Sequence, residues 1–199
     1  MGIKQENEIT VKALCEPDEL CEILKNKGFN VVDKFTMNDI FMLPNSMKSK
    51  LKDLTSREIL KNAILIRDSD NKFYGTRNKT IIFKKKEFDN DGNILNQQSI
   101  KCSINNIDEA VNLFKSLNYY IIMNIVENSI VYGKDGLEIY VKDIQDGLHL
   151  IEVETVSNNK KIDTIEKLKK EIINLQLPLD TTNFFVKKAE IELDKIIKR

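Results

Sequence analysis

Polar and apolar residues alternate along residues 6–14, close to the N-terminus. Successive side chains of a strand point to opposite faces, so Glu8, Thr10 and Lys12 share one face, and the apolar residues between them share the other. The pattern therefore predicts a strand with one charged face and one face that packs against a core.

The same alternation returns at residues 151–154, where Glu152 and Glu154 share one face. Two strands of this kind can concentrate carboxylates in one place. The alternative is a pair of half-exposed strands whose glutamates are solvated, and the periodicity alone does not separate these two interpretations.

Further strands are predicted where short apolar or alternating runs are bounded by turn residues. They cover residues 29–43 (one long or two shorter strands), 63–67, 79–84, 94–104, 119–132, 137–143 and 148–155. Turn chemistry occurs at residues 68–71, 89–93 and 133–136. Short turns join the last three strands, which must therefore pair antiparallel.

Apolar residues at helical spacing predict helices between and after these strands. They cover residues 15–28, 107–117, 160–177 and 187–198, with a looser amphipathic pattern at 45–62. No internal repeat or low-complexity linker divides the chain, which favours a single domain that spans residues 1–199. About eight strands with helices inserted between them predict an α+β fold, a closed or nearly closed eight-stranded antiparallel β-barrel (tunnel) with the helices outside, because closure removes edge strands.

Composition narrows the function classes. A chain of 199 residues can bury a core without disulfides or a structural metal. Its 31 basic residues equal its 31 acidic residues, so no global basic field attracts nucleic acid or an anionic membrane. The three cysteines have no paired metal-ligand spacing, and no apolar run reaches membrane length. We expect a cytoplasmic monomer or homodimer with no nucleic-acid or membrane partner.

Common catalytic signatures are missing from the sequence, which has no glycine-rich phosphate loop, nucleophile elbow or zinc spacing. His149 is the only histidine, so any histidine chemistry would pass through one residue. What remains is carboxylates and basic side chains on strands. This combination suits Mg²⁺ or Mn²⁺, which prefer oxygen ligands, and phosphates held by lysine and arginine.

Four short motifs follow one another along the chain: Glu8-x-Thr10-x-Lys12, Ile64-Leu65-Ile66-Arg67, Ile81-Ile82-Phe83-Lys84 and Glu152-x-Glu154. In order and spacing they resemble the CYTH family, also called triphosphate tunnel metalloenzymes, which includes class IV adenylate cyclases, thiamine triphosphatases and inorganic triphosphatases. The resemblance spans roughly residues 3–156 and implies an eight-stranded antiparallel tunnel. Residues 160–199 look like the helical C-terminal part that packs against such tunnels.

The resemblance also implies roles for six residues. The acids that match metal ligands of the family are Glu8, Glu152 and Glu154. The basic residues that match triphosphate ligands are Lys12, Arg67 and Lys84, with Lys12 also the catalytic candidate. The implied cofactor is Mg²⁺ or Mn²⁺, and the implied partner is a small-molecule triphosphate, either a nucleoside triphosphate, inorganic triphosphate or thiamine triphosphate.

The sequence departs from the family pattern at several positions. Thr10 replaces an acid, Leu65 replaces an arginine, and Lys142, next to Asp143, stands where an aspartate is usual. The basic residues expected before Tyr132 are replaced by Glu127, Asn128 and Ser129. Two functions therefore stay open. One is a metal-dependent enzyme that hydrolyses or cyclises a triphosphate compound, and the other is a catalytically inactive nucleotide- or polyphosphate-binding protein of the same fold.

Overall fold

The computed structural model describes residues 8–88, 94–154 and 164–198. The chain separates into two compact units. The first contains residues 1–36, 71–74 and 127–187, and the second contains residues 37–70, 75–126 and 188–199. The expectation of a single domain that spans residues 1–199 stays a prediction.

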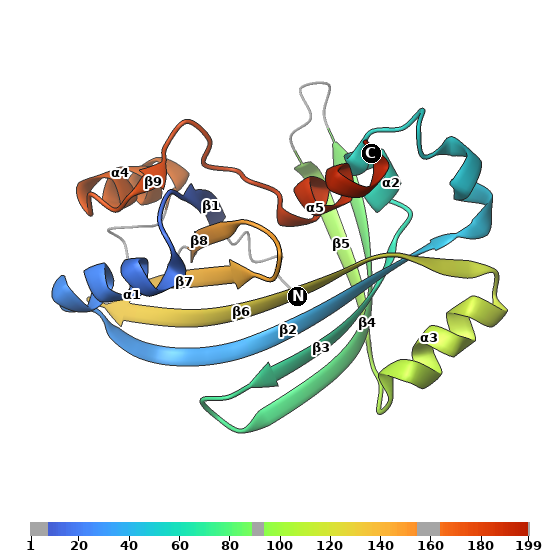
Figure 1. The fold of residues 1–199 in the computed structure, drawn as a ribbon, viewed down its shortest axis with the longest axis horizontal. Coiled ribbons are helices and arrows are strands. Elements are labelled where there is room, and N and C mark those ends of the chain that lie inside the picture. Colours follow the sequence, from blue (N-terminus) through green and yellow to red (C-terminus); the bar gives the residue numbers. More distant parts are fainter. Residues whose placement is uncertain (1–7, 89–93, 155–163, 199) are drawn as a thin grey trace. The chain divides into compact units, whose positions relative to one another are not determined.

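The elements follow one another as labelled in Figure 1. The strands are β1 (Glu8–Ala13), β2 (Asn30–Pro44), β3 (Ile64–Asn71), β4 (Thr76–Phe88), β5 (Ile94–Ser103), β6 (Tyr119–Lys134), β7 (Leu137–Ile144), β8 (His149–Glu154) and β9 (Leu179–Asp180). The helices are α1 (Pro17–Asn26), α2 (Ser56–Leu60), α3 (Ile107–Ser116), α4 (Ile165–Asn174) and α5 (Lys188–Ile197), with a 3-10 helix at Asn45–Lys50. The α+β class is confirmed.

The strands form one sheet in the order β5-β4-β3-β2-β6-β7-β8-β1-β9. This order has two ends, so over the described residues the sheet is open, and the predicted closed eight-stranded barrel is wrong. One edge of β1 pairs antiparallel with β8. Its other edge is taken by the segment after α4, because Lys12 and Ala13 pair with β9 and the backbone N–H of Thr10 donates to Phe184. A short added strand therefore covers the edge that closure was expected to remove.

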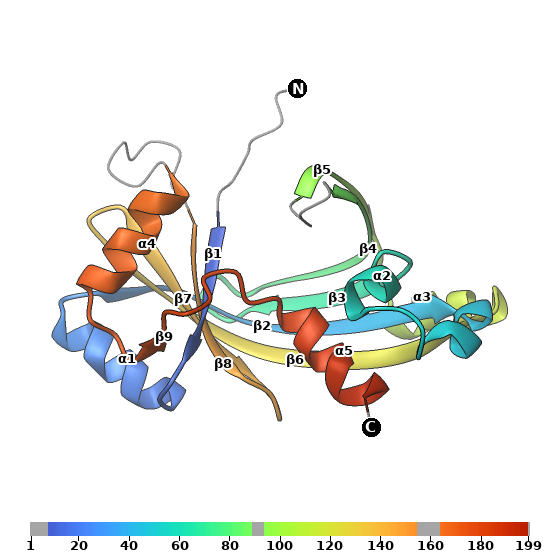
Figure 2. The same ribbon diagram turned by 90° about the horizontal axis from the view of Figure 1, so that it is seen from above.

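The first unit has an apolar layer formed by helices on one face of its strands. Helices α1 and α4 lie beside β1, β7 and β8, as Figure 2 shows. The apolar odd-numbered residues of these strands, including Ile9, Val11, Ile151 and Val153, are buried in one core with residues of both helices. Because strand side chains alternate, this packing sends the even-numbered residues of β1 and β8 to the opposite face. The predicted strand with one charged and one core face is confirmed for residues 8–13.

The second unit has its own small core. Helix α3 packs Ala110 and Val111 against Met42 of β2 and Ile66 of β3. Its first turn is capped by Asn106, whose side-chain oxygen accepts from two backbone N–H groups. Helix α2 has a capping box and contacts α5. The loose pattern predicted at residues 45–62 thus becomes a 3-10 helix and the short α2.

One predicted turn is wrong. Residues 68–71 carry turn chemistry in the sequence, but they continue β3, and the chain reverses after Asn71. In the second unit, Asp68 accepts two hydrogen bonds from Arg77 of β4, which holds the two strands together at this point. Asn71 supplies the turn itself, because its side-chain oxygen accepts from the N–H groups of Phe73 and Tyr74.

Within the described residues, no helix is both long and apolar enough to cross a membrane. The turn predicted at residues 89–93 lies outside the described part of the chain. The same holds for residues 6–7, the predicted start of the first strand, and for residues 160–163, the predicted start of the C-terminal helical segment.

Gly133 of β6 permits close packing inside the first unit. A Cβ atom added at this residue would lie 2.8 Å from Cγ1 of Val32 on β2. We predict that Gly133→Ala lowers the free energy of unfolding by about 1–3 kcal/mol through overpacking. Combining it with Val32→Ala should recover part of this loss, because the two residues are in contact. Urea denaturation of the three variants measures the coupling, and additive losses would contradict the predicted contact.

Candidate functional site

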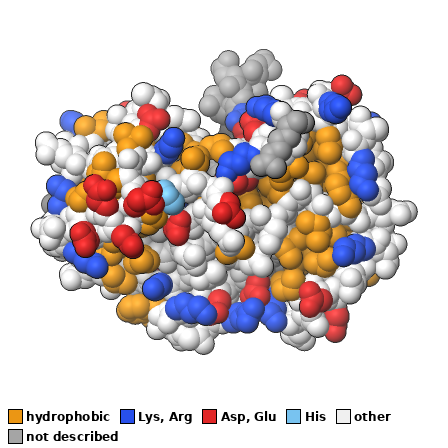
Figure 3. Space-filling model, viewed as in Figure 1, with side chains coloured by type: hydrophobic (Ala, Val, Ile, Leu, Met, Phe, Trp, Pro, Cys, Tyr) orange, Lys and Arg blue, Asp and Glu red, His pale blue; other side chains and the backbone are white. Residues whose placement is uncertain are grey.

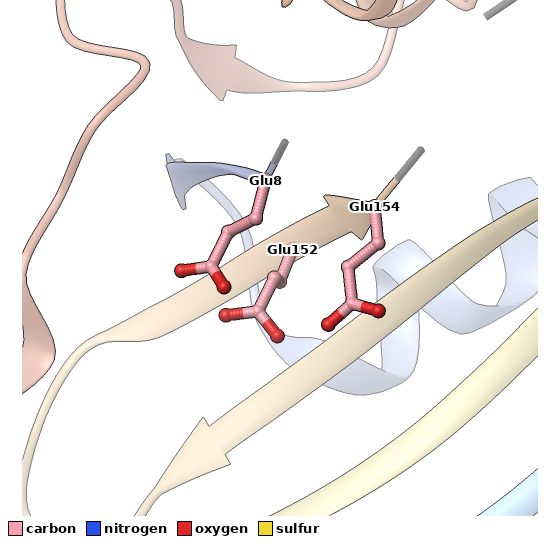
Figure 4. Close-up of side chains that lie close together, drawn as sticks. All are labelled: Glu8, Glu152 and Glu154. Carbon is pink, nitrogen blue, oxygen red and sulfur yellow. The ribbon is translucent and has the colours of Figure 1, made fainter. Parts of the chain in front are cut away.

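Three carboxylates meet on the charged face of the first unit. Backbone pairing of β1 with β8 places Glu8 opposite Glu154 and Thr10 opposite Glu152. One ligand oxygen from each of Glu8, Glu152 and Glu154 lies within 4.8 Å of the others. Figure 4 shows the three side chains, one from β1 and two from β8, pointing to the same side of the strands. The structure thus brings together the three acids that the sequence motifs marked as metal ligands.

The donor set fits a hard divalent cation. Mg²⁺ and Mn²⁺ prefer carboxylate oxygens. Oxygens on opposite sides of an ion that holds them at about 2.1 Å are about 4.2 Å apart. Three oxygens within 4.8 Å of one another therefore need only a rotation of the side chains to share such an ion. Glu8 is exposed and the two acids of β8 are half-buried, so the cluster is open to solvent on the side of β1.

Lys142 of β7 is the cation nearest to these acids among the ion pairs of the described residues. Its Nζ lies 2.6 Å from Oε1 of Glu152. Its side chain is 11% exposed and that of Glu152 is 15% exposed, so water screens this pair only weakly. Thr10, also buried, donates its hydroxyl to Oε2 of Glu152 at 3.4 Å. Each oxygen of Glu152 thus has a partner within the sheet.

A second carboxylate lies on the other side of this lysine. Glu127 of β6 is fully buried, and its Oε1 is 4.0 Å from Nζ of Lys142. The hydroxyl of Ser129, which is opposite Lys142 in the β6–β7 pairing, donates to the same oxygen at 2.7 Å. The ammonium of Lys142 therefore lies between two carboxylates, one close and one more distant.

Tyr140 completes the charged face on β7, opposite Glu152 in the pairing with β8. Burial and the nearby negative charges of Glu154, Glu138 and Glu152 raise the pKa of the Tyr140 hydroxyl well above its usual range. The hydroxyl therefore keeps its proton at neutral pH and is available as a hydrogen-bond donor beside the acids. No family motif in the sequence indicated this residue.

Lys12 lies on the same face of β1 as Glu8, two positions beyond Thr10. It is opposite Asp180 in the pairing with β9. Hydrogen bonds from Thr182 are the main cause that lowers the pKa of Asp180, and the charge of Lys12 adds to them. The structure thus places the proposed phosphate ligand on the charged face, at the opposite end of β1 from Glu8.

Asp143 does not join the acidic cluster. It follows Lys142 on β7 and therefore points to the other face, where it pairs with His149 of β8. Nδ1 of His149 lies 3.1 Å from Asp143, and its Nε2 lies 3.3 Å from Glu16. Figure 3 shows the histidine beside acidic side chains on the surface. The only histidine of the chain thus lies close to two surface acids on the face opposite the acidic cluster.

Arg67 belongs to the second unit, where it forms an ion pair. Its Nε and one terminal nitrogen donate to the two oxygens of Asp39 at 2.6 and 2.7 Å. Lys188, at the start of α5, lies 3.5 Å from the same carboxylate. Burial acts to raise the pKa of Asp39, but the hydrogen bonds and charge of Arg67, together with Lys188, outweigh it and lower that pKa. Two cations thus surround one buried carboxylate, and the family motifs did not indicate Lys188.

Lys84 of β4 is opposite Ser99 of β5 in the sheet. Its side chain lies outside the described part of the structure, as do those of residues 85–88 and 94–98. Its role as a triphosphate ligand therefore stays a prediction, as do the roles of Lys12 and Arg67.

Comparison with known proteins supports the fold. The PH1819 protein from Pyrococcus horikoshii OT3 superimposes with a TM-score of 0.65 at 20% identity, covering 96% of this chain and 99% of that one. A protein from Vibrio parahaemolyticus provisionally named an adenylate cyclase gives 0.56 at 13% identity, covering 94% and 97%. HpAC1 from Hippeastrum, provisionally named an adenylyl cyclase and described as having a dominant triphosphatase activity, gives 0.50 at 11% identity, covering 89% and 91%.

No family model matches the sequence, and no curated protein matches it. The resemblance to triphosphate tunnel proteins that the four motifs indicated is confirmed at the level of the fold, since proteins named for adenylate cyclase and triphosphatase activity share it.

The ion pair of Asp39 predicts a pH-dependent stability. Asp39→Asn should lower the free energy of unfolding by about 3 kcal/mol at neutral pH, because it removes the carboxylate between two cations. A lowered folded-state pKa stabilises the fold above the unfolded pKa, and this contribution disappears as the pH falls through the folded pKa. The difference between the native protein and the variant should therefore be constant above about pH 5 and become smaller below about pH 4.

A matched control is Asp68→Asn. Asp68 also accepts two hydrogen bonds from one arginine, which lower its pKa, but the side chain of that Arg77 is 59% exposed. Its loss should cost no more than about 1 kcal/mol. Urea unfolding of both variants between pH 3 and 8 is the measurement, and equal losses at the two positions would contradict the importance assigned to burial at Asp39.

Proposed function

We propose that this chain binds a small-molecule triphosphate together with Mg²⁺ or Mn²⁺, and that the cation is held by Glu8, Glu152 and Glu154. The observation that carries the proposal is the convergence of these three carboxylates within 4.8 Å on one face of the first unit. It is supported by the shared fold with a protein described as having triphosphatase activity. When bound, the cation would neutralise phosphate oxygens and so favour attack at phosphorus.

The chain's own residues offer several contacts for such a ligand. Tyr140, which keeps its proton, can donate to a phosphate oxygen from beside the acids. Lys12 lies on the same face of the same unit and is proposed to bind phosphate. Arg67 and Lys84 are proposed as further triphosphate ligands, as the sequence motifs imply. The expected location in the cytoplasm stays a prediction.

The second candidate function is binding without turnover. The observation that favours it is the commitment of Lys142 to Glu152 at 2.6 Å, where the family pattern has an aspartate. The bidentate pairing of Arg67 with Asp39 favours it too, because a guanidinium held by a carboxylate has fewer donors for phosphate. Loss of one positioned electrostatic contact commonly reduces a rate by about 10²- to 10³-fold. We therefore expect that the triphosphate binds measurably and is turned over slowly or not at all.

The test is a set of thermal melts with and without Mn²⁺ and triphosphate. A ligand that binds the folded state alone raises its melting temperature, by an amount that corresponds to about 2.7 kcal/mol at a hundredfold excess over Kd. The native protein should show such a rise. The variant Glu152→Gln/Glu154→Gln should show none, whereas Glu22→Gln on the exposed side of α1 should behave like the native protein.

Turnover is measured separately, with ATP, inorganic triphosphate and thiamine triphosphate as substrates and Mg²⁺ or Mn²⁺ present. Sustained release of phosphate or formation of a cyclic nucleotide from any of them rejects the binding-only function. If the melting temperature of the native protein is the same with and without metal and triphosphate, the proposed function itself is wrong.

A further inference from the structure

A buried lysine in the middle of an acidic site needs an explanation. The side chain of Lys142 is 11% exposed, and its ammonium lies against Glu152, one of the three acids of the proposed cation site. An ammonium and a divalent cation repel each other, and this repulsion is strong where water is largely excluded. A metal ion that binds the carboxylate of Glu152 would therefore compete with this ammonium in its present position.

Glu127 offers the ammonium a second position. Its Oε1 lies 4.0 Å from Nζ of Lys142, beyond direct contact but within reach of a small rotation of the lysine side chain. Glu127 is itself fully buried and is held in place by the hydroxyl of Ser129 at 2.7 Å. Glu127 is therefore a second carboxylate within reach of the same ammonium.

We propose that Lys142 is an internal counter-cation that is exchanged for metal: it pairs with Glu152 when the site holds no divalent ion and moves toward Glu127 when one binds. The inference rests on the proposed function, because it assumes that Glu8, Glu152 and Glu154 receive the cation. It adds that occupancy of the site is set by a competition within the chain. The exchange moves one side chain and involves no covalent step.

Charge balance explains what the exchange achieves. The three acids carry three negative charges, and Lys142 compensates one of them when no metal is bound. A divalent ion replaces this compensation and leaves the ammonium beside Glu127, within the same unit. The site is therefore stable without metal, at the cost of weaker binding of metal when it arrives.

The test uses Mn²⁺ alone as the probe, measured by titration calorimetry and by the electron paramagnetic resonance signal of free Mn²⁺. Lys142→Gln removes the competing charge and should bind Mn²⁺ at least about tenfold more tightly than the native protein. Lys142→Arg keeps the charge and should bind as the native protein does. Lys134→Gln removes a lysine at the far end of β6, where it donates to the backbone oxygen of Lys27, and should also leave the affinity unchanged.

A second readout follows from linkage. Without metal, Lys142→Gln should melt at a lower temperature than the native protein, because Glu152 loses its ion pair at 2.6 Å. Saturating Mn²⁺ should raise the melting temperature of the variant by more than that of the native protein. If Lys142→Gln does not fold, the double variant Glu127→Gln/Lys142→Met replaces it, since it removes the charge of the lysine together with that of the buried carboxylate 4.0 Å from it.

The possible outcomes separate the inference from the function on which it rests. Tighter Mn²⁺ binding in the variant, including binding that appears only in the variant, supports the exchange. Equal affinity in the native protein and in Lys142→Gln overturns the exchange and leaves the proposed cation site intact. Absence of Mn²⁺ binding in both proteins, with no change in either melting temperature, overturns the cation site and the exchange together.

Discussion

The ion pair between Lys142 and Glu152 is the interaction on which the charged face of the first unit depends. Five strands of that unit carry residues of one hydrophobic core, so the sheet has to be covered on one side and hydrated or internally compensated on the other. Glu127 and Lys142 are both buried on the charged side. Neither could remain charged there alone, because an isolated ion in such surroundings loses its hydration with nothing in return.

The core and the candidate site are two consequences of the same strand register. Ile9, Ile151 and Val153 pack under α1 and α4, and this packing fixes which residues of β1 and β8 point away from the helices. A slip of one residue would bury Glu8 and Glu152 under the helices and expose the isoleucines, which makes such a slip very unfavourable. The positions of the carboxylates are therefore defined by the stability of the core, although none of them contributes apolar contacts to it.

Alternation in the sequence predicted that Glu8 lies on the polar face of its strand and that Glu152 and Glu154 share one face of theirs. Periodicity did not show that these two strands are neighbours, and the meeting of the three acids was implied only by the family resemblance. Lys142 was interpreted as the loss of an aspartate, since a sequence does not show which of two nearby acids a lysine will pair with. The same applies to Lys188, whose partner Asp39 is distant in sequence. Long-range ion pairs of this kind leave no periodic signal.

The errors in the fold have similar physical causes. Residues 68–71 look like a turn by composition, yet the bidentate pair of Asp68 with Arg77 makes them part of a hairpin. Propensity is a weak guide where a cross-strand pair decides. Closure of the barrel was inferred from the cost of open edges, and β9, with only two residues, was too short to be recognised as the strand that covers one edge.

Two of the departures from the family pattern lie on neighbouring strands, β6 and β7. The pattern places basic residues before Tyr132 and an acid at position 142, whereas this chain has Glu127 on the first strand and Lys142 on the second. The acid and the base thus lie on the strands opposite to those of the pattern, and the cation lies next to Glu152. A cation in that place compensates carboxylates. In the family pattern, the basic residues before Tyr132 compensate phosphates instead. Under the proposed exchange, the acids are therefore partly compensated when the site is empty, and a metal ion has to displace this compensation in order to bind.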